Sequence, residues 1–393
     1  MIPRRRARTY PGQVRALLSG LLFGSGDGVE GFQEALARYL GVRFVLLTAS
    51  GRQALDLLLA ESGLAAGARI VFPALSLRDL LVRVQSAGYR PVVVDVEERS
   101  LNIAPQALDA VEHWDAVVAT HLFGNPCRLP GVQAAAKKRG AVLFEDCAHA
   151  LGARYDGAPV GTFGLGSIFS FEAIKSVNTF GGGCVATNDA ALAARIEHRL
   201  ASLPLDRAAV AKKCAVSLAM DLLLRSPLYR PLTILMGSEL AKQALTRVYL
   251  SMRDATVPRP TAYHPAQATV GVQLLKSLDA MNQRCRQLAE AYRTQLGGRL
   301  AVQQEEDLGQ SNRYIISALC DGDARDLQRE LARRGIDVGI GEELVDDCSG
   351  FAGGPPCPVA QAAVSRLVQL PGYHQMTDRD LHRVVRAVAG ALA

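Results

Sequence analysis

Short apolar runs alternate with amphipathic stretches along the first half of the chain. The runs occupy residues 44–47, 70–72, 91–94, 116–119, 141–144, 167–171 and 184–186. Between the first five lie stretches with helical spacing, at residues 53–60, 80–86, 105–111 and 132–138. Buried strands joined through helices are typical of a mainly parallel sheet with helices on both faces. The pattern therefore predicts an α/β fold, in which ligands bind beyond the carboxyl ends of the strands.

Two helices, at residues 13–23 and 29–40, are predicted ahead of this sheet, and a second alternation follows it. A long helix at 270–296 leads to a strand at 314–319, a helix at 324–334, a polar loop at 346–358 and helices at 359–367 and 378–392. This order predicts a smaller α+β domain, of a size that is common for a second domain. We expect a large domain at residues 1–260 and a small C-terminal domain at 261–393.

The large domain carries an apolar helical insert at about residues 200–255. Its most apolar part is residues 216–237, VSLAMDLLLRSPLYRPLTILMG. Charged residues and prolines interrupt this segment, so it lacks the ~20 continuous apolar residues that span a bilayer. Two interpretations are open: helices that pack on the core or on a second subunit, and a helical hairpin that dips into a membrane surface.

The composition excludes extended disorder, since 49% of the 393 residues are hydrophobic and 21% are charged. Part of the net charge of +6 comes from MIPRRRARTY at the start and from Lys212, Lys213, Arg225 and Arg230. A solvated basic surface is the simplest interpretation, and attraction to anionic lipid or to an acidic substrate is the alternative. Nucleic acid is not an expected partner, because the sequence has no helix-turn-helix, zinc-finger or RNP-type pattern.

The eight cysteines are dispersed without CxxC spacing, and no secretory signal follows the N-terminal arginines. Free thiols in a reducing cytoplasm are therefore expected. The seven histidines show no paired ligand spacing, so no metal site is predicted. Gly26, Gly28 and Gly31 match a dinucleotide fingerprint by letter, but no strand precedes them, and a turn before a helix is predicted instead.

Three clusters of polar residues fall at the ends of predicted strands. Residues 144–149 (FEDCAH) end a strand in two carboxylates, residues 169–175 (FSFEAIK) place a lysine after another strand, and residues 48–53 (TASGRQ) form a small-residue turn that opens a helix. Together they suit pyridoxal 5'-phosphate (PLP), which needs a lysine amine for its aldehyde, a carboxylate for its ring nitrogen and a helix N-terminus for its phosphate. Each cluster is common alone, and their order along one α/β chain is what favours the cofactor.

The stretch EDCAHALGARYDGAPVGTFGLGSIFSFEAIKSVNTFGGGCVAT resembles the core of the DegT/DnrJ/StrS family of PLP-dependent sugar aminotransferases. Similar segments extend over almost the whole chain, from VEGFQEALARYLGVRFVLLTASGRQALDLLL to LVQLPGYHQMTDRDLHRVVRAV. The resemblance implies the PLP-transferase fold of type I, with a mainly parallel seven-stranded sheet and a smaller C-terminal α+β domain. It also implies a homodimer, because sites in this family are shared between subunits.

The resemblance also implies a role for each candidate residue. Lys175 would hold PLP as a Schiff base and later shuttle the proton, Asp146 would pair with the ring nitrogen, and His149 would lie near the phenolic oxygen. Two helix-start amides and two hydroxyls would bind the phosphate, from Gly51, Arg52, Ser50 and Ser170.

Several positions depart from the family pattern. Leu77 stands where the family has an aromatic ring that stacks on the cofactor, and Arg52 replaces a threonine or serine and offers its charge to the phosphate. The Asn-x-Arg motif that reaches the partner subunit's cofactor is not recognisable near residues 260–263. These departures bear on the substrate and on stacking more than on PLP binding.

The expected activity is an aminotransferase that moves an amino group from an amino acid, glutamate in many relatives, to an oxo group, with Lys175 as acid and base. The resemblance implies a nucleotide-sugar acceptor, whereas the apolar insert favours a lipid-linked or otherwise hydrophobic one. Another PLP-dependent reaction (dehydration, decarboxylation or condensation) and a non-catalytic regulatory relative are the alternatives. We expect a cytoplasmic protein, with peripheral membrane contact through residues 216–237 if the insert meets lipid.

Overall fold

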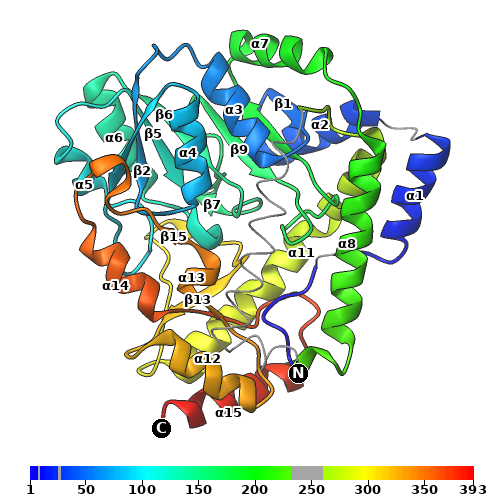
Figure 1. Cartoon of the computed structure of the whole chain (residues 1–393), viewed down its shortest axis with the longest axis vertical. Helices are drawn as coiled ribbons and strands as arrows, with labels where there is room; N and C mark the ends of the chain where they lie inside the picture. Colours follow the sequence, from blue (N-terminus) through cyan, green and yellow to red (C-terminus); the bar gives the residue numbers. More distant parts are fainter. Residues whose placement is uncertain (8, 25–27, 232–259) are drawn as a thin grey trace.

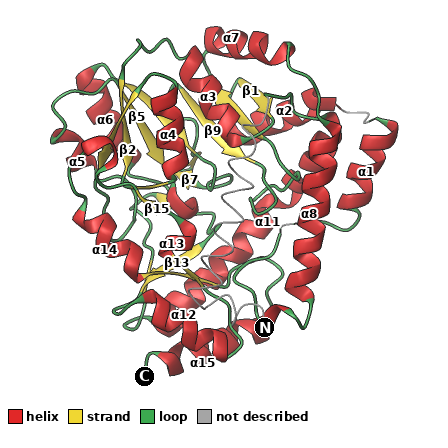
Figure 2. Ribbon diagram, viewed as in Figure 1, coloured by secondary structure: helices red, strands yellow, loops and turns green. Residues whose placement is uncertain are grey.

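The central sheet has seven strands, in the order β1-β10-β9-β6-β5-β2-β4 (Figures 1 and 2). A computed structural model describes residues 1–7, 9–24, 28–231 and 260–393. The strands are β1 (Phe44–Thr48), β2 (Arg69–Pro73), β4 (Arg90–Val94), β5 (Ala116–Thr120), β6 (Val142–Asp146), β9 (Gly166–Ser170) and β10 (Gly183–Thr187). Each strand coincides with one of the seven apolar runs, so the predicted sheet is confirmed.

The strand directions bring several chain segments to one edge of this sheet. Strands β9, β6, β5, β2 and β4 pair in parallel, and β10 is antiparallel to both β9 and β1. Strands β1, β6 and β9 therefore end at the edge where β10 begins. Asp146 and Ser170, the last residues of β6 and β9, lie at this edge, as the sequence predicts.

The two faces of the sheet form separate cores, because successive side chains of a strand point to opposite faces. Val45, Leu47 and Val117 belong to one core, and Leu46, Ala116 and Val118 to the other. The first core is closed by α1 (Gln13–Phe23), α2 (Gly28–Leu40), α5 (Pro105–Asp109), α6 (Leu129–Arg139) and the start of α11 (Pro265–Leu296). The second core is closed by α3 (Gly51–Glu61), α4 (Arg78–Ser86) and α7 (Ala190–Ala201).

A second, antiparallel sheet follows the long helix α11, in the order β11-β13-β16-β14. Its strands are β11 (Ala301–Val302), β13 (Ile316–Leu319), β14 (Gly339–Ile340) and β16 (Leu367–Leu370). It packs with the end of α11, with α12 (Ala324–Arg333) and with α15 (Asp378–Ala391) around a third core. The sequence predicted only one of these strands, at 314–319. Strands β11 and β14 have two residues each and show no alternating pattern, and β16 directly follows a helix that was predicted to run to residue 367.

Five further short strands lie outside the strands that the sequence predicted. Strand β12 (Gly309–Gln310) pairs with β7 (Arg154–Tyr155), which pairs with β8 (Ala158–Pro159). Within the predicted polar loop at 346–358, β15 (Asp346–Asp347) pairs with β3 (Leu75–Ser76), and a 3-10 turn covers Phe351–Gly353. The predicted polar loop thus contains two short elements that the sequence did not predict, and β15 attaches it to the segment just before α4. The helix predicted at 359–367 is α14 (Pro358–Arg366).

The apolar insert begins with α8 (Arg207–Arg225), a helix that starts at Asp206, whose side chain accepts a hydrogen bond from the Ala209 N–H. The chain then continues as described structure to residue 231, and residues 232–237 of the apolar segment lie outside the described residues. Among the described helices, none is both long enough and apolar enough to cross a membrane.

Helices α2 and α11 approach each other closely at Gly271. A Cβ atom added there would lie 2.4 Å from Cζ of Phe32, a fully buried ring. We expect Gly271→Ala to lower the free energy of unfolding by about 1–3 kcal/mol, because the ring must shift in a close-packed core. Urea unfolding followed by circular dichroism measures this change.

The control is Gly390→Ala in α15. There the added Cβ would meet the far end of the flexible Arg334 side chain, so the variant should be neutral or slightly stabilising through helix propensity. Equal stability of the two variants would contradict the close contact at Gly271.

Candidate active site

The turn between β1 and α3 forms one wall of the site. Ser50 precedes α3 as its N-cap, and its hydroxyl accepts a hydrogen bond from the Gln53 N–H at 3.1 Å. A Cβ atom on Gly51 would lie 3.1 Å from Cβ of Ser170, and one on Gly183 would lie 2.6 Å from the Gly51 nitrogen. Glycine at both positions therefore lets the start of α3, the end of β9 and the start of β10 close on one another. The result is a positive helix terminus with two hydroxyls beside it, which suits a phosphate.

The glycine-rich turn before β10 is fixed by the start of α11. Gln267 Nε2 donates to the carbonyl oxygens of Thr179 and Gly181, at 2.9 and 3.0 Å. The Tyr263 hydroxyl lies 3.0 Å from the Thr179 hydroxyl in a buried hydrogen bond. These contacts attach a segment about 85 residues further along the chain to the turn that meets Gly51.

Lys175 lies in the loop after β9 and is the cationic centre of the site. Its Nζ lies 5.2 Å from the centre of the Tyr314 ring. Burial lowers the pKa of the amine to about 8, and the positive charges of Arg5 and Arg52 act in the same direction, whereas the carboxylates of Asp146 and Glu172 oppose it. The amine can therefore exchange a proton near neutral pH.

Asp146 supplies the opposite charge. It is buried at the end of β6, and its Oδ1 accepts a hydrogen bond from the Ala148 N–H at 2.9 Å. Burial raises the pKa of this carboxyl, while the Ala148 N–H and the charge of Lys175 lower it. The lysine and the aspartate thus stabilise each other's charged form across the strand ends.

His149 lies between two aromatic rings. Its ring stacks on Tyr314 at 4.9 Å and on Phe123 at 6.1 Å between centroids. Burial lowers the pKa of His149 well below its usual value, and the charges of Lys175 and Arg5 add to this, so the imidazole is neutral. Its Nδ1 accepts the Phe123 N–H at 3.3 Å, which leaves the hydrogen on Nε2 as a donor.

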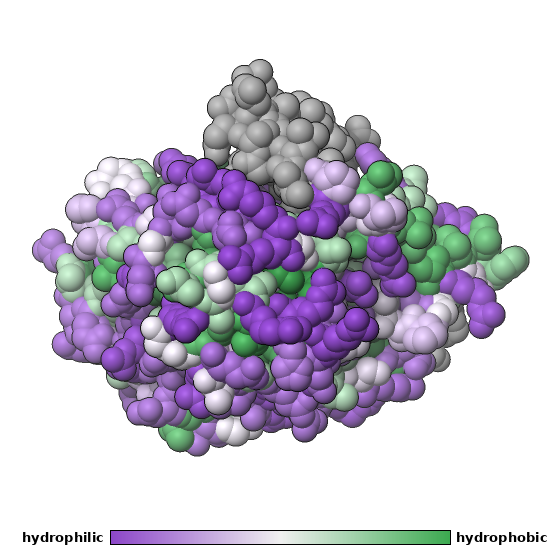
Figure 3. Space-filling model, turned by 90° about the horizontal axis from the view of Figure 1, so that it is seen from below, coloured by the Kyte–Doolittle hydropathy of each residue, from purple (hydrophilic) through white to green (hydrophobic). Residues whose placement is uncertain are grey.

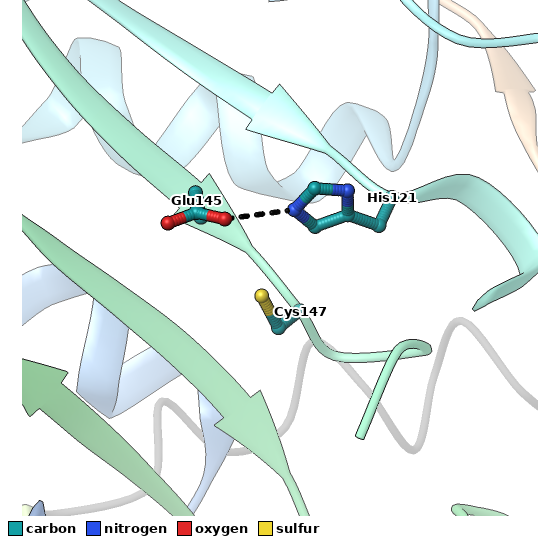
Figure 4. Close-up of side chains that lie close together, drawn as sticks. All are labelled: His121, Glu145 and Cys147. Atoms are coloured by element: carbon teal, nitrogen blue, oxygen red, sulfur yellow. Dashed lines mark hydrogen bonds and ion pairs between the residues drawn. The ribbon is translucent and has the colours of Figure 1, made fainter. Parts of the chain in front are cut away.

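Glu145, beside Asp146, belongs to a buried polar cluster with His121 and Cys147 (Figure 4). His121 Nδ1 accepts the Cys127 N–H at 3.1 Å, so its Nε2 carries the hydrogen that is donated to Glu145 at 3.1 Å. Glu145 also accepts backbone N–H groups from Gly161, Phe163 and Gly164 (2.7, 2.7 and 3.1 Å). Burial raises the pKa of the Cys147 thiol, so it stays protonated. The hydrogen bonds of His121 and Glu145 fix the end of β6 next to Asp146.

Two predicted residues are connected less directly to this arrangement. The Arg52 Nε lies 2.9 Å from a carboxylate oxygen of Asp79 in α4, so the charge expected to answer the phosphate already has a partner. Leu77 is 40% exposed and lies two residues before Asp79, at the start of α4. Leu77 stands at the start of the helix whose Asp79 pairs with Arg52. Its role opposite the cofactor ring stays a prediction.

The sequence analysis missed Arg5 and Arg4, which it interpreted as part of a solvated basic surface. Arg4 instead pairs with the buried Asp337 at 2.8 Å, and Ile2 forms a bridge with Ile336, so the first residues lie along the second sheet. Arg5 thereby comes close enough to Lys175 and His149 to lower the pKa of both. No local signal reveals this, because the contacts join residues more than 300 positions apart.

Asn312 and Tyr314 were also missed. Asn312 Nδ2 donates to the carbonyl oxygen of His149 at 2.9 Å and to that of Leu151 at 3.0 Å, which holds the segment after Asp146. Tyr314 contributes a ring to both His149 and Lys175. An aromatic residue that opens a predicted strand, two residues after an Asn, is too common to be recognised as a site residue from sequence.

The residues present fit PLP by their chemistry. A lysine with a lowered pKa, a buried carboxylate, a neutral imidazole donor and a hydroxyl-lined helix N-terminus converge on one edge of the sheet. Lys175, Asp146 and His149 would hold the aldehyde and ring, and the turn at Ser50 and Gly51 with Ser170 would hold the phosphate. Glycine at position 51 keeps this turn open, because a Cβ atom there would lie against Cβ of Ser170.

Comparison with known proteins agrees with this geometry. The chain is similar to L-glutamine:2-deoxy-scyllo-inosose aminotransferase from Streptomyces fradiae, at 35% identity over 189 residues that cover 48% of this chain and 45% of the relative. It is 31% identical to GDP-perosamine synthase from Escherichia coli O157:H7 over 175 residues, covering 44% and 48% of the two chains. The matched segments thus span about half the length of these curated relatives.

The fold and the family follow from two further comparisons. The crystal structure of the aminotransferase TlmJ from Streptoalloteichus hindustanus superposes with a TM-score of 0.79 at 22% identity, over 100% of this chain and 99% of that chain, which confirms the type I fold. The model of the DegT/DnrJ/EryC1/StrS aminotransferase family matches residues 7–218 and 264–389. The chain therefore belongs to the DegT/DnrJ/EryC1/StrS aminotransferase family.

Proposed function

We propose that this chain is a PLP-dependent aminotransferase that moves an amino group from an amino acid, with glutamate as the first candidate, to an oxo group. The acceptor is a nucleotide sugar or a hydrophobic, lipid-linked oxo compound. The observation that carries the proposal is the Lys175 amine, with its pKa lowered to about 8, facing the charge of the buried Asp146. The sugar-aminotransferase names of the similar proteins support the acceptor class.

When bound, PLP supplies an aldehyde that exchanges amines and a ring that draws electrons from the substrate carbon. Asp146 would hold the ring nitrogen through its carboxyl group, whose pKa is raised by burial and lowered by the Ala148 N–H and the charge of Lys175. His149 offers a neutral N–H donor, since its other nitrogen is occupied by the Phe123 N–H. These residues orient the ring and favour its protonated form.

Lys175 moves the proton. Because the pKa of its amine is about 8, both protonation states are populated near neutrality, and Nζ can take a proton from the substrate carbon and return it. The Tyr314 ring lies 5.2 Å from this amine and stacks on His149. The neighbouring Arg5 and Arg52 favour its neutral form.

The finer expectations from the sequence are part of the same proposal. We infer a homodimer, a cytoplasmic location and a division into a PLP-binding part at residues 1–260 and a smaller part at 261–393. The two separate sheets support this division, because each has a core of its own.

The first test is Lys175→Ala, with Lys175→Arg as the control that keeps the charge but cannot form the covalent link to PLP. Both variants should lose the visible absorbance of the PLP-loaded protein and at least about 100-fold in turnover, because they lack the amine that carries the proton. The assay follows nitrogen from labelled glutamate into a panel of nucleotide-sugar and lipid-linked oxo acceptors. Wild-type turnover in either variant would refute the assignment of Lys175, and absence of transfer by wild type would refute the aminotransferase.

Asp146→Asn tests the charge across the ring. The amide keeps an oxygen for the Ala148 N–H but removes the negative charge, so PLP should still bind while turnover falls by about 100-fold. Steady-state kinetics and circular dichroism together check this result. Asp378→Asn, at a surface ion pair with Arg284, is the control and should keep full turnover.

Arg5→Ala tests the influence of the N-terminal segment on Lys175. PLP adds to the neutral amine, so its rate of addition to cofactor-free protein should rise with pH through about 8 and then level off. Removing Arg5 removes one charge that lowers the pKa, and the rise should move to higher pH. Absorbance-monitored rates over the neutral to alkaline range show the shift, and Arg15→Ala on the exposed side of α1 should leave the profile unchanged.

A further inference from the structure

Large apolar side chains are exposed together on α1 and on the segment that begins with α8. On α1, Leu22 is 68% exposed and Phe23 is 85% exposed. On α8, Met220 is 53% exposed and Leu222 is 69% exposed. The two helices lie against each other, and Figure 3 shows hydrophobic side chains gathered at this side of the molecule. We call these side chains the α1–α8 face, whose further members are Leu18, Val216, Leu218 and Leu228.

Part of this face lies outside the family match. The match stops at residue 218 and resumes at residue 264, so Met220, Leu222 and Leu228 lie in a stretch that the family model does not cover. The sequence stays apolar beyond this point, with LTILM at residues 232–236 outside the described residues. Contiguous exposed apolar side chains of this kind mark an interaction surface.

The charges around the face indicate which partner it fits. Helices α1 and α8 carry five basic residues (Arg15, Arg207, Lys212, Lys213 and Arg225) and one acidic residue, Asp221, which already pairs with Arg225 at 2.8 Å. A second copy of the chain across a twofold axis would oppose this positive charge with the same charge. A negatively charged lipid surface complements both the apolar centre and the basic surroundings.

The face is also attached to the active site. Lys213 Nζ lies 2.9 Å from Glu172, three residues before Lys175, and it borders Gly181 in the glycine-rich turn. At the far end of the segment the Tyr229 hydroxyl donates to Asp337 at 2.6 Å, and Arg230 donates to the Arg333 carbonyl at 3.1 Å. A partner bound to the α1–α8 face would therefore lie beside the loop that carries Lys175. The segment itself is held next to the second sheet by Tyr229 and Arg230.

We propose that the α1–α8 face docks onto an anionic lipid surface and holds the active site next to an oxo acceptor carried by that surface. The docking itself does not depend on the aminotransferase assignment, and only the nature of the acceptor rests on the proposed function. The helices lie on the surface with their apolar side chains inserted and their basic side chains at the level of the headgroups.

The test is co-sedimentation of the full chain with phosphatidylcholine vesicles, with and without phosphatidylglycerol. Wild type should bind the anionic vesicles, and salt should weaken binding because it screens the basic side chains. The double variant Phe23→Glu and Leu222→Glu should reduce binding by at least about tenfold, since two charges would enter the interfacial region. Val82→Glu, at an exposed apolar position of α4, is the matched control and should bind as wild type does.

Three outcomes would overturn the proposal: no vesicle binding by wild type, equal binding by wild type and the double variant, or loss of a dimer in the double variant without any vesicle binding. The last outcome would identify a second copy as the occupant of the face. Vesicle binding is measured without substrate, and turnover with a water-soluble acceptor is measured without vesicles. Failure of the docking and failure of the aminotransferase are thereby distinguished.

Discussion

The whole arrangement depends on placing a partly buried lysine and a buried carboxylate within electrostatic range of each other beyond the ends of parallel strands. Burial alone would discharge both groups, because it lowers the pKa of Lys175 and raises that of Asp146. Each charge offsets part of the other's burial, and the amine settles near neutrality. If both groups were fully solvated, Lys175 would stay protonated at neutral pH. If the lysine were buried without Asp146, the site would have no anion for the ring nitrogen of a bound cofactor.

That balance requires the strand ends to be held in place, and several buried polar residues fix them by hydrogen bonds. Glu145 fixes the end of β6 through His121 and the 161–164 backbone, while Gln267 at the start of α11 fixes the turn that leads into β10. Buried polar groups are costly unless every bond is made, so these networks favour one geometry over others. The absence of a side chain at Gly51 and Gly183 then leaves the space where the phosphate-binding turn and the strand ends meet.

The parts that sequence analysis predicted well are those with a local signature. The seven apolar runs have strand length and follow one another through helices, and the motifs around Asp146 and Lys175 are contiguous in the chain. Strands β11 and β14 escaped prediction because two residues carry no period, and β16 because the helix before it was predicted to run to residue 367. Arg5 escaped because its position follows from the pairing of Arg4 with Asp337, which a basic N-terminus does not reveal.

The segment after α7 lies beside the site, and the family match ends within it, at residue 218. Helix α8 contacts the catalytic loop through one ion pair, Lys213 with Glu172, in which both side chains are about 40% exposed. Such a pair contributes little to stability because water and salt screen it. The charge of Glu172 nevertheless acts on Lys175, so the position of α8 enters the balance of charges at the amine. An insert that touched Asp146 or the buried Glu145 network instead would have altered the geometry of the strand ends themselves.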